Sequence, residues 1–436
     1  MLNILGGDKL IVGYDLGNDY SQISYCKVGS AEVETLSLVA GEEAFSIPTV
    51  LCKREKVNQW FFGREALRYV QENQGVLVDN LVQMAVDGEE VRIEGKPFDP
   101  VALLTLFFKR SLGLLAQVTG TDKIAHLMIT CHHLDPRMLE ILGQVVDGLK
   151  LKTDQIHFQG HMESFYNYII RQPEELWSFQ TVLCDYRQDK MNVYWMQCNK
   201  RTTPVVAFME SAEYPFTPFD PMPDAERLRR DKMERMDREL LKLAEQICEG
   251  RIVSSVHLIG EGFTEEWMKD SLRFLCKSRR VFQGNNLFSK GACYCLLEQL
   301  EETEIGKSHV FLGSDKLKAN IGMKILRRGE ESYYALLDAG TNWYESDHTM
   351  QCYVKDDKEL EFVVTPLIGK TVIHHTMLLT DLAEGISRLS VRAYLPEEKL
   401  LKIEVTDLGF GEFRPSGGRV WEDTVELYRE ETDTAG

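Results

Sequence analysis

The chain has 436 residues, of which 44% are hydrophobic and 27% charged, a balance typical of a soluble globular protein of two or three domains. Asp and Glu total 68 against 50 Lys and Arg, so the formal net charge is −18. An acidic excess of this size repels phosphate backbones and anionic lipids, and no run approaches the ~20 apolar residues that span a bilayer. We therefore expect a cytoplasmic protein that binds neither nucleic acid nor membranes.

Short strands alternate with amphipathic helices in the first part of the chain. Residues 10–14 and 20–28 are rich in β-branched and aromatic residues, and Gly17-Asn18-Asp19 between them is typical of a hairpin turn. Apolar residues recur at helical spacing after Asp99, a residue type that often caps helices. In chain order we expect strands at 10–14, 20–28, within 47–62, and at 124–130, 181–184 and 191–197, and helices at 100–115, 136–149 and 163–171.

The second part of the chain changes from helical to strand patterns. Residues 214–223 contain four prolines and predict a loop, and a long charged helix is expected at 224–249. A strand at 254–259 and helices at 264–276 and 287–301 follow. After His309, alternating runs between turn residues predict an antiparallel β domain. Its strands are expected at 333–337, 349–354, 360–365, 390–394 and 401–406.

Cysteine and histidine residues offer little evidence of a metal site. Most of the ten cysteines lie inside apolar runs, which is typical of buried thiols in a reducing compartment. The closest pair, Cys293 and Cys295, points to different faces of a predicted helix. Neighbouring histidines on a strand face opposite sides, so the pairs His132-His133 and His374-His375 are poor chelators. We expect no metal at these positions.

The segments Ile11–Gly17, Ile47-Pro48-Thr49, 181–185 and 256–262 follow one another along the chain. In this order they resemble motifs of the actin-like ATPase superfamily, and most closely those of its DnaK-type heat-shock chaperones. Residues 11–17 resemble the first phosphate loop, and strand 181–185 corresponds to the second. Residues 256–262 are similar to the adenosine loop. The other segments that carry the resemblance are Ile47-Pro48-Thr49, Gly63-Arg64-Glu65-Ala66, Lys290-Gly291-Ala292 and the apolar Val310-Phe311-Leu312, which is placed like the interdomain linker.

The resemblance implies a two-lobed actin-like (ribonuclease H-like) ATPase domain followed by a small antiparallel β-sandwich. It places the ATPase-type domain at residues 1–308, a linker at 309–315, a β-sandwich like a chaperone substrate-binding domain at 316–429, and a flexible tail at 430–436. The segment before helix 224–249 is short, so the lobe that closes over adenine is expected to be reduced. We expect no helical lid after the β domain.

The same resemblance supplies the candidate site. Asp15 and Asp185 occupy its two carboxylate positions, and they are the residual catalytic candidates and the Mg²⁺ ligands if a nucleotide binds. The candidate nucleotide-binding residues are Gly13, Asp15, Gly17, Asn18, Asp185, Arg187, Gly260 and Gly262.

Several positions depart from the pattern of an active ATPase. The second loop reads Asp185-Tyr186-Arg187-Gln188-Asp189-Lys190, so side chains stand where backbone N–H groups must approach phosphate. Leu67 falls at the position of the catalytic lysine, Gly160 at that of a catalytic glutamate, and Asn192 at that of a second aspartate. We therefore expect no cofactor, with ATP and Mg²⁺ as the alternative.

Three functions compete. The leading hypothesis is a non-catalytic, chaperone-like protein that binds a polypeptide or serves as a scaffold. The alternatives are a slow ATPase, with Arg187, Lys190 and Arg68 rebuilding the phosphate site, and an actin-like polymerising scaffold. A peptide groove is expected around Leu337, Trp343 and Tyr353, unless these side chains form the core of the β domain.

Overall fold

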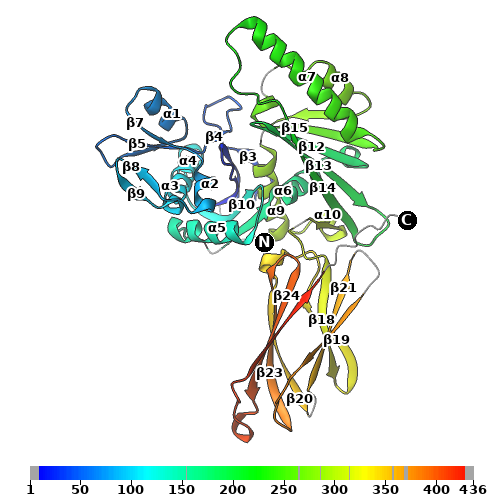
Figure 1. Ribbon diagram of the computed structural model, residues 1–436. Helices are drawn as coiled ribbons and strands as arrows, with labels where there is room; N and C mark the ends of the chain where they lie inside the picture. Colours follow the sequence, from blue (N-terminus) through cyan, green and yellow to red (C-terminus); the bar gives the residue numbers. More distant parts are fainter. Residues whose placement is uncertain are drawn as a thin grey trace. The chain divides into compact units, whose positions relative to one another are not determined.

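The computed structural model is a mixed α/β protein with several sheets (Figure 1). The chain divides into two compact units, residues 1–310 and 311–436. The predicted tail at 430–436 lies outside the residues that the structure describes. Those are 9–153, 155–263, 266–284, 286–313, 315–355, 358–367 and 372–427.

The first sheet of unit 1 begins with the predicted hairpin. Strands β1 and β2 pair antiparallel, β3 continues on the far side of β2, and β10 and β11 add parallel strands next to β1. The order across the sheet is therefore β11-β10-β1-β2-β3. The strands are β1 (Leu10–Asp15), β2 (Tyr20–Lys27), β3 (Glu34–Thr35), β10 (Ile124–Cys131) and β11 (Ile156–Gly160).

The second sheet of unit 1 repeats this path. An antiparallel β12–β13 pair extends to β14, and β15 and β16 add parallel strands next to β12, in the order β16-β15-β12-β13-β14. The chain thus builds one topology twice, although no sequence repeat is evident. The strands are β12 (Gln180–Arg187), β13 (Lys190–Asn199), β14 (Val205–Pro215), β15 (Val253–Ile259) and β16 (Arg280–Gln283).

Helices join the parallel strands of both sheets, and several predicted bounds are confirmed. Asp99 caps its helix by accepting hydrogen bonds from the N–H groups of Val101 and Ala102. The helices are α3 (Pro100–Leu112), α4 (Leu114–Thr119), α5 (Pro136–Leu149), α6 (His161–Ile169), α7 (Glu226–Cys248), α8 (Asp270–Leu275), α9 (Leu287–Leu300) and α10 (Glu304–Ser308).

A small inserted region lies between β3 and β10. It contains the short strands predicted within 47–62 and two helices, and it forms the left part of unit 1 in Figure 1. Its elements are β4 (Ile47–Pro48), β5 (Leu51–Arg54), β6 (Trp60–Phe62), α1 (Gly63–Gln71), β7 (Gly75–Val78), α2 (Leu81–Asp87), β8 (Val91–Ile93) and β9 (Lys96–Phe98).

One stretch qualifies the expectation that no segment is long and apolar enough to span a membrane. Pro100–Thr119 meets that description by length and composition, with a hydropathy of 1.5. In the structure it forms α3 and α4, and Phe107 and Phe108 are completely buried inside unit 1. A core helix passes the same test, so the stretch is weak evidence for a membrane span.

Unit 2 is built from two four-stranded antiparallel sheets. Their orders are β19-β18-β21-β22 and β20-β23-β24-β25. A hydrogen bond joins them, because His375 Nε2 on β22 lies 2.8 Å from Asp423 Oδ2 on β25. The strands are β18 (Ala319–Arg327), β19 (Glu330–Leu337), β20 (Asp347–Lys355), β21 (Glu359–Pro366), β22 (Ile373–Leu378), β23 (Ile386–Glu397), β24 (Leu400–Gly409) and β25 (Val420–Glu426), and β17 (His309–Leu312) contains the boundary between the units.

Two predicted segments differ from the structure. The expected loop 214–223 begins inside β14, a strand whose side chains are mostly half-buried or exposed and therefore lack an alternating apolar pattern. Of the expected helix 264–276, the described residues are α-helical only in α8 (Asp270–Leu275). Its start is fixed by Asp237 on α7, whose carboxylate accepts hydrogen bonds from the N–H groups of Lys269, Asp270 and Ser271.

Candidate functional site

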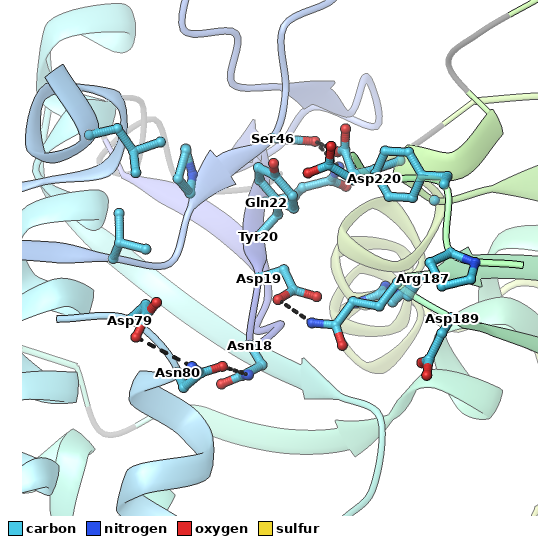
Figure 2. Close-up of a pocket in the computed structure, with 18 of the residues that line it drawn as sticks. Asn18, Asp19, Tyr20, Gln22, Ser46, Asp79, Asn80, Arg187, Asp189 and Asp220 are labelled. Atoms are coloured by element: carbon cyan, nitrogen blue, oxygen red, sulfur yellow. Dashed lines mark hydrogen bonds between the residues drawn. The ribbon is translucent and has the colours of Figure 1, made fainter. Parts of the chain in front are cut away.

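A cavity of about 440 Å³ lies in unit 1 where the ends of the two repeated sheets face each other (Figure 2). One wall comes from the β1–β2 hairpin and the inserted region. The opposite wall comes from the β12–β13 hairpin, the loop after β14 and the end of β15. Its volume is in the range of small-molecule sites. We call it the interlobe pocket.

Carboxylates dominate the polar lining of the interlobe pocket, and among the described lining residues Arg187 is the only Lys or Arg. Apolar side chains such as Val50, Leu77 and Phe219 complete the walls. The pKa of the Tyr20 hydroxyl is raised, first by burial and then by the charges of nearby carboxylates. The pocket therefore has a negative potential. The lining carboxylates are Asp15, Asp19, Asp79, Asp189, Asp220 and Glu261.

Asp15 is held by a histidine that the sequence analysis missed. His161 Nε2 lies 2.7 Å from Asp15 Oδ1, and both side chains are buried. The imidazole stacks on Phe288 of α9 with ring centroids 3.8 Å apart. His161 is the first residue of α6 and follows Gly160, the position at which the sequence resemblance predicts a catalytic glutamate. This neighbouring position was the only sequence signal for His161. Asp15 thus has a fixed partner within the protein.

Asp185 is held in the same way by Arg187. The two residues lie on one side of β12, because side chains alternate along a strand. Arg187 Nε donates to both carboxylate oxygens of the completely buried Asp185, at 3.0 and 2.8 Å. Asp185 itself does not line the pocket. Both candidate Mg²⁺ ligands therefore already bind protein cations or N–H groups.

The predicted glycines mainly allow close packing of the chain on itself. A Cβ at Gly13 would lie 2.2 Å from the carbonyl oxygen of Ser289 on α9. At Gly260, where φ is +101°, it would lie 2.1 Å from the carbonyl oxygen of Tyr186, and at Gly262 it would overlap the Tyr186 ring. These contacts explain the glycines without a phosphate ligand.

The structure brings together half of the predicted nucleotide-binding residues. Asp15, Asn18, Arg187 and Gly260 line the interlobe pocket. The other four, Gly13, Gly17, Asp185 and Gly262, do not.

Side chains at the hairpin tips bind other protein groups. Asn18 Nδ2 donates to Asn80 Oδ1 at 2.9 Å, and Gln188 Nε2 donates to Asp19 Oδ1 at 2.7 Å (Figure 2). The second bond connects the first sheet's hairpin to that of the second sheet. Leu67, at the position where the sequence resemblance predicts a catalytic lysine, forms part of the apolar wall.

Other lining residues were missed because no motif marks them. Asp79 and Asn80 follow β7 of the inserted region, and Asp220 lies in the loop after β14. Gln22 and Ser46 also line the pocket. These residues are distant in sequence, and only the tertiary fold brings them together around one cavity.

One expectation about histidines was wrong. His132 and His133 do not face opposite sides of a strand, because β10 ends at Cys131 and the following bend places their rings 4.1 Å apart. Tyr194 O–H lies 3.0 Å from His132 Nδ1. Within the described residues, no group of three His, Cys, Asp or Glu side chains could hold a metal ion. Cys293 Sγ lies 3.8 Å from Cys26 Sγ, a contact that the sequence did not indicate.

Two family models match the chain. The model described as the C-terminal part of a family of unknown function, DUF5716, matches residues 32–314. A domain of unknown function, DUF8552, matches residues 316–427. No curated protein matches the chain.

Proposed function

Since the chain belongs to the DUF5716 family, whose function is unknown, we propose from its site a non-catalytic, chaperone-like protein that binds a polypeptide. In this proposal, residues 1–308 form an actin-like domain with a decayed ATP site. The two sheets of unit 2 form a β-sandwich that contacts the partner.

The repeated topology of unit 1 supports the actin-like fold. The sequence resemblance implies two lobes of the same architecture that enclose a cleft. Both sheets have the same strand order, with an antiparallel hairpin on one side and parallel strands on the other. Ligands in open α/β sheets bind beyond the carboxyl ends of the strands, and β1, β12 and β15 all end at the interlobe pocket.

The observation that carries the non-catalytic assignment is the engagement of both candidate Mg²⁺ ligands. Asp15 contacts His161, and Asp185 is fully buried against Arg187. A polyphosphate entering the pocket would meet the charges of Asp19, Asp220 and the other lining carboxylates at short range. Nucleotide binding is therefore unfavourable.

We expect the full chain to show no binding heat with Mg-ATP and no ATP turnover above background. Isothermal titration calorimetry and a phosphate-release assay measure the two quantities. Micromolar affinity together with turnover that Asp185→Asn and Asp15→Asn each abolish would contradict the proposal. That result would favour the slow ATPase instead.

The polypeptide surface in this proposal is a small aromatic patch on unit 2. Tyr353 on the edge strand β20 is 65% exposed, and Phe413 is 91% exposed. The Phe410 ring lies between them, with centroids 5.9 Å from Tyr353 and 6.1 Å from Phe413. An unpaired strand edge beside apolar side chains can accept an added strand. We call Tyr353, Phe410 and Phe413 the aromatic patch.

The aromatic patch includes only part of the peptide groove that the sequence predicted. Leu337 and Trp343 are buried, so they belong to the core of unit 2, and of the three named residues only Tyr353 is exposed. Strands bury alternate residues, and an exposed aromatic cannot be distinguished from a core one by composition.

Fluorescent peptides of about eight alternating apolar and polar residues test the aromatic patch. We expect Tyr353→Ser/Phe413→Ser to weaken their binding by about tenfold or more in fluorescence anisotropy, because exposed aromatics often dominate such contacts. Leu326→Ser removes an apolar side chain from the other sheet whose exposure lies between those of Tyr353 and Phe413, and it is the control. Equal weakening by both changes, or no binding by the unaltered chain, would contradict this role.

A further inference from the structure

The interlobe pocket contains a buried acceptor without a partner. Gln22 is only 6% exposed and lines the cavity, and its Nε2 donates to Ser46 Oγ at 3.3 Å. Its Oε1 is fully buried and accepts no hydrogen bond. Buried polar atoms are nearly always satisfied, so this oxygen indicates a missing donor. Gln22 and Ser46 lie side by side in Figure 2.

The groups around Gln22 are also acceptors. Ser46 Oγ donates onward to Glu261 Oε1 at 2.8 Å. Glu261, Asp19 and Asp220 are the carboxylates that raise the pKa of Tyr20 after burial, so all three act on this end of the cavity. Arg187, the one Lys or Arg in the described part of the lining, is held by Asp185. A ligand that complements this end must carry positive charge and several N–H donors.

The apolar walls distinguish an organic cation from a metal ion. Pro48, Val50, Leu67 and Leu77 form one wall, and Phe219 lies in the facing loop. Divalent metals need several oxygens at 2.0–2.6 Å in a closed shell. The described residues include no metal-holding group of three, whereas methylene segments fit apolar walls.

From these contacts we infer that the interlobe pocket binds an aliphatic polyamine, with one ammonium group at Gln22, Glu261 and Asp220 and its methylenes along Val50, Leu67 and Leu77. This inference goes beyond the proposed polypeptide binding and uses a separate part of the molecule. It also gives the cavity a ligand of the charge opposite to that of ATP.

Titration calorimetry of the full chain with spermidine and with agmatine tests the inference. At about 0.15 M NaCl, where long-range attraction is screened, we expect saturable binding of one molecule per chain. Asp220→Asn/Glu261→Gln keeps the side-chain shapes and removes two charges, and we expect it to weaken binding by about tenfold or more. Gln22→Leu removes the unpaired acceptor and is expected to weaken binding less.

Glu226→Gln is the control, because this glutamate on α7 is exposed and does not line the pocket. If Glu226→Gln weakens amine binding as much as the double change does, the amines are attracted diffusely to the net charge of −18. That result would overturn the inference. Failure of both amines to bind would also overturn it. Neither failure affects the expected absence of ATP turnover, so the two proposals are tested separately.

Discussion

Replacing Gly291 by alanine is expected to lower the free energy of unfolding of unit 1 by about 3 kcal/mol or more, because the new methyl group cannot be accommodated. Gly291 lies on α9, and an added Cβ would be 1.9 Å from the carbonyl oxygen of Ser164 on α6. These two helices pack against each other. The carbonyl belongs to a helix backbone and cannot move aside without shifting α6.

This loss is measured by urea unfolding, with hydrogen exchange of peptides from α9 and β1 as the probe. Gly143→Ala is the matched control, because Gly143 is a helix glycine with open space around its Cβ position. It is expected to stabilise α5 by up to about 1 kcal/mol through helix propensity. Equal stabilities of the two variants would contradict the close approach of α6 and α9.

Local patterns predicted most elements of the chain, since hydrophobic periodicity and caps report on single elements. The hairpin before Lys27, helix α5 and most strands of unit 2 are confirmed. Two failures have different causes, one tertiary and one local. Helix α8 begins where Asp237 of another helix accepts its N–H groups, and β14 lacks the alternation that identifies a strand.

The candidate site was less predictable than the fold. Motif positions identified Asp15, Asn18, Arg187 and Gly260, which the structure places at one pocket. Motifs could not reveal Gln22, Ser46 or Asp220, because they come together only when the two sheets face each other. The glycines show the opposite problem, since a glycine required by helix packing and one required by a phosphate have the same sequence signal.

Removing the Arg187 side chain tests the electrostatics of the site directly. We expect Arg187→Leu to destabilise unit 1 by about 3–5 kcal/mol, because it leaves the charge of Asp185 buried without a partner. The Arg187 side chain is 31% exposed, so solvent screens its charge. We therefore expect the loss of stability to lie near the lower of the two values. Urea unfolding with hydrogen exchange of β12 peptides measures the change.

The double variant Asp185→Asn/Arg187→Leu separates the charge from the packing. If the buried carboxylate causes the loss, neutralising it should restore most of the stability, because an amide of the same shape carries no charge to desolvate. Lys190→Leu is the control, because Lys190 forms an exposed ion pair with Glu213 on the neighbouring strand, and exposed pairs of this kind contribute little to stability. A double variant no more stable than Arg187→Leu would mean that Arg187 acts through packing against the hairpins. The pair would then be no obstacle to a cation at Asp185, and the Asp185 carboxylate would be available to Mg²⁺.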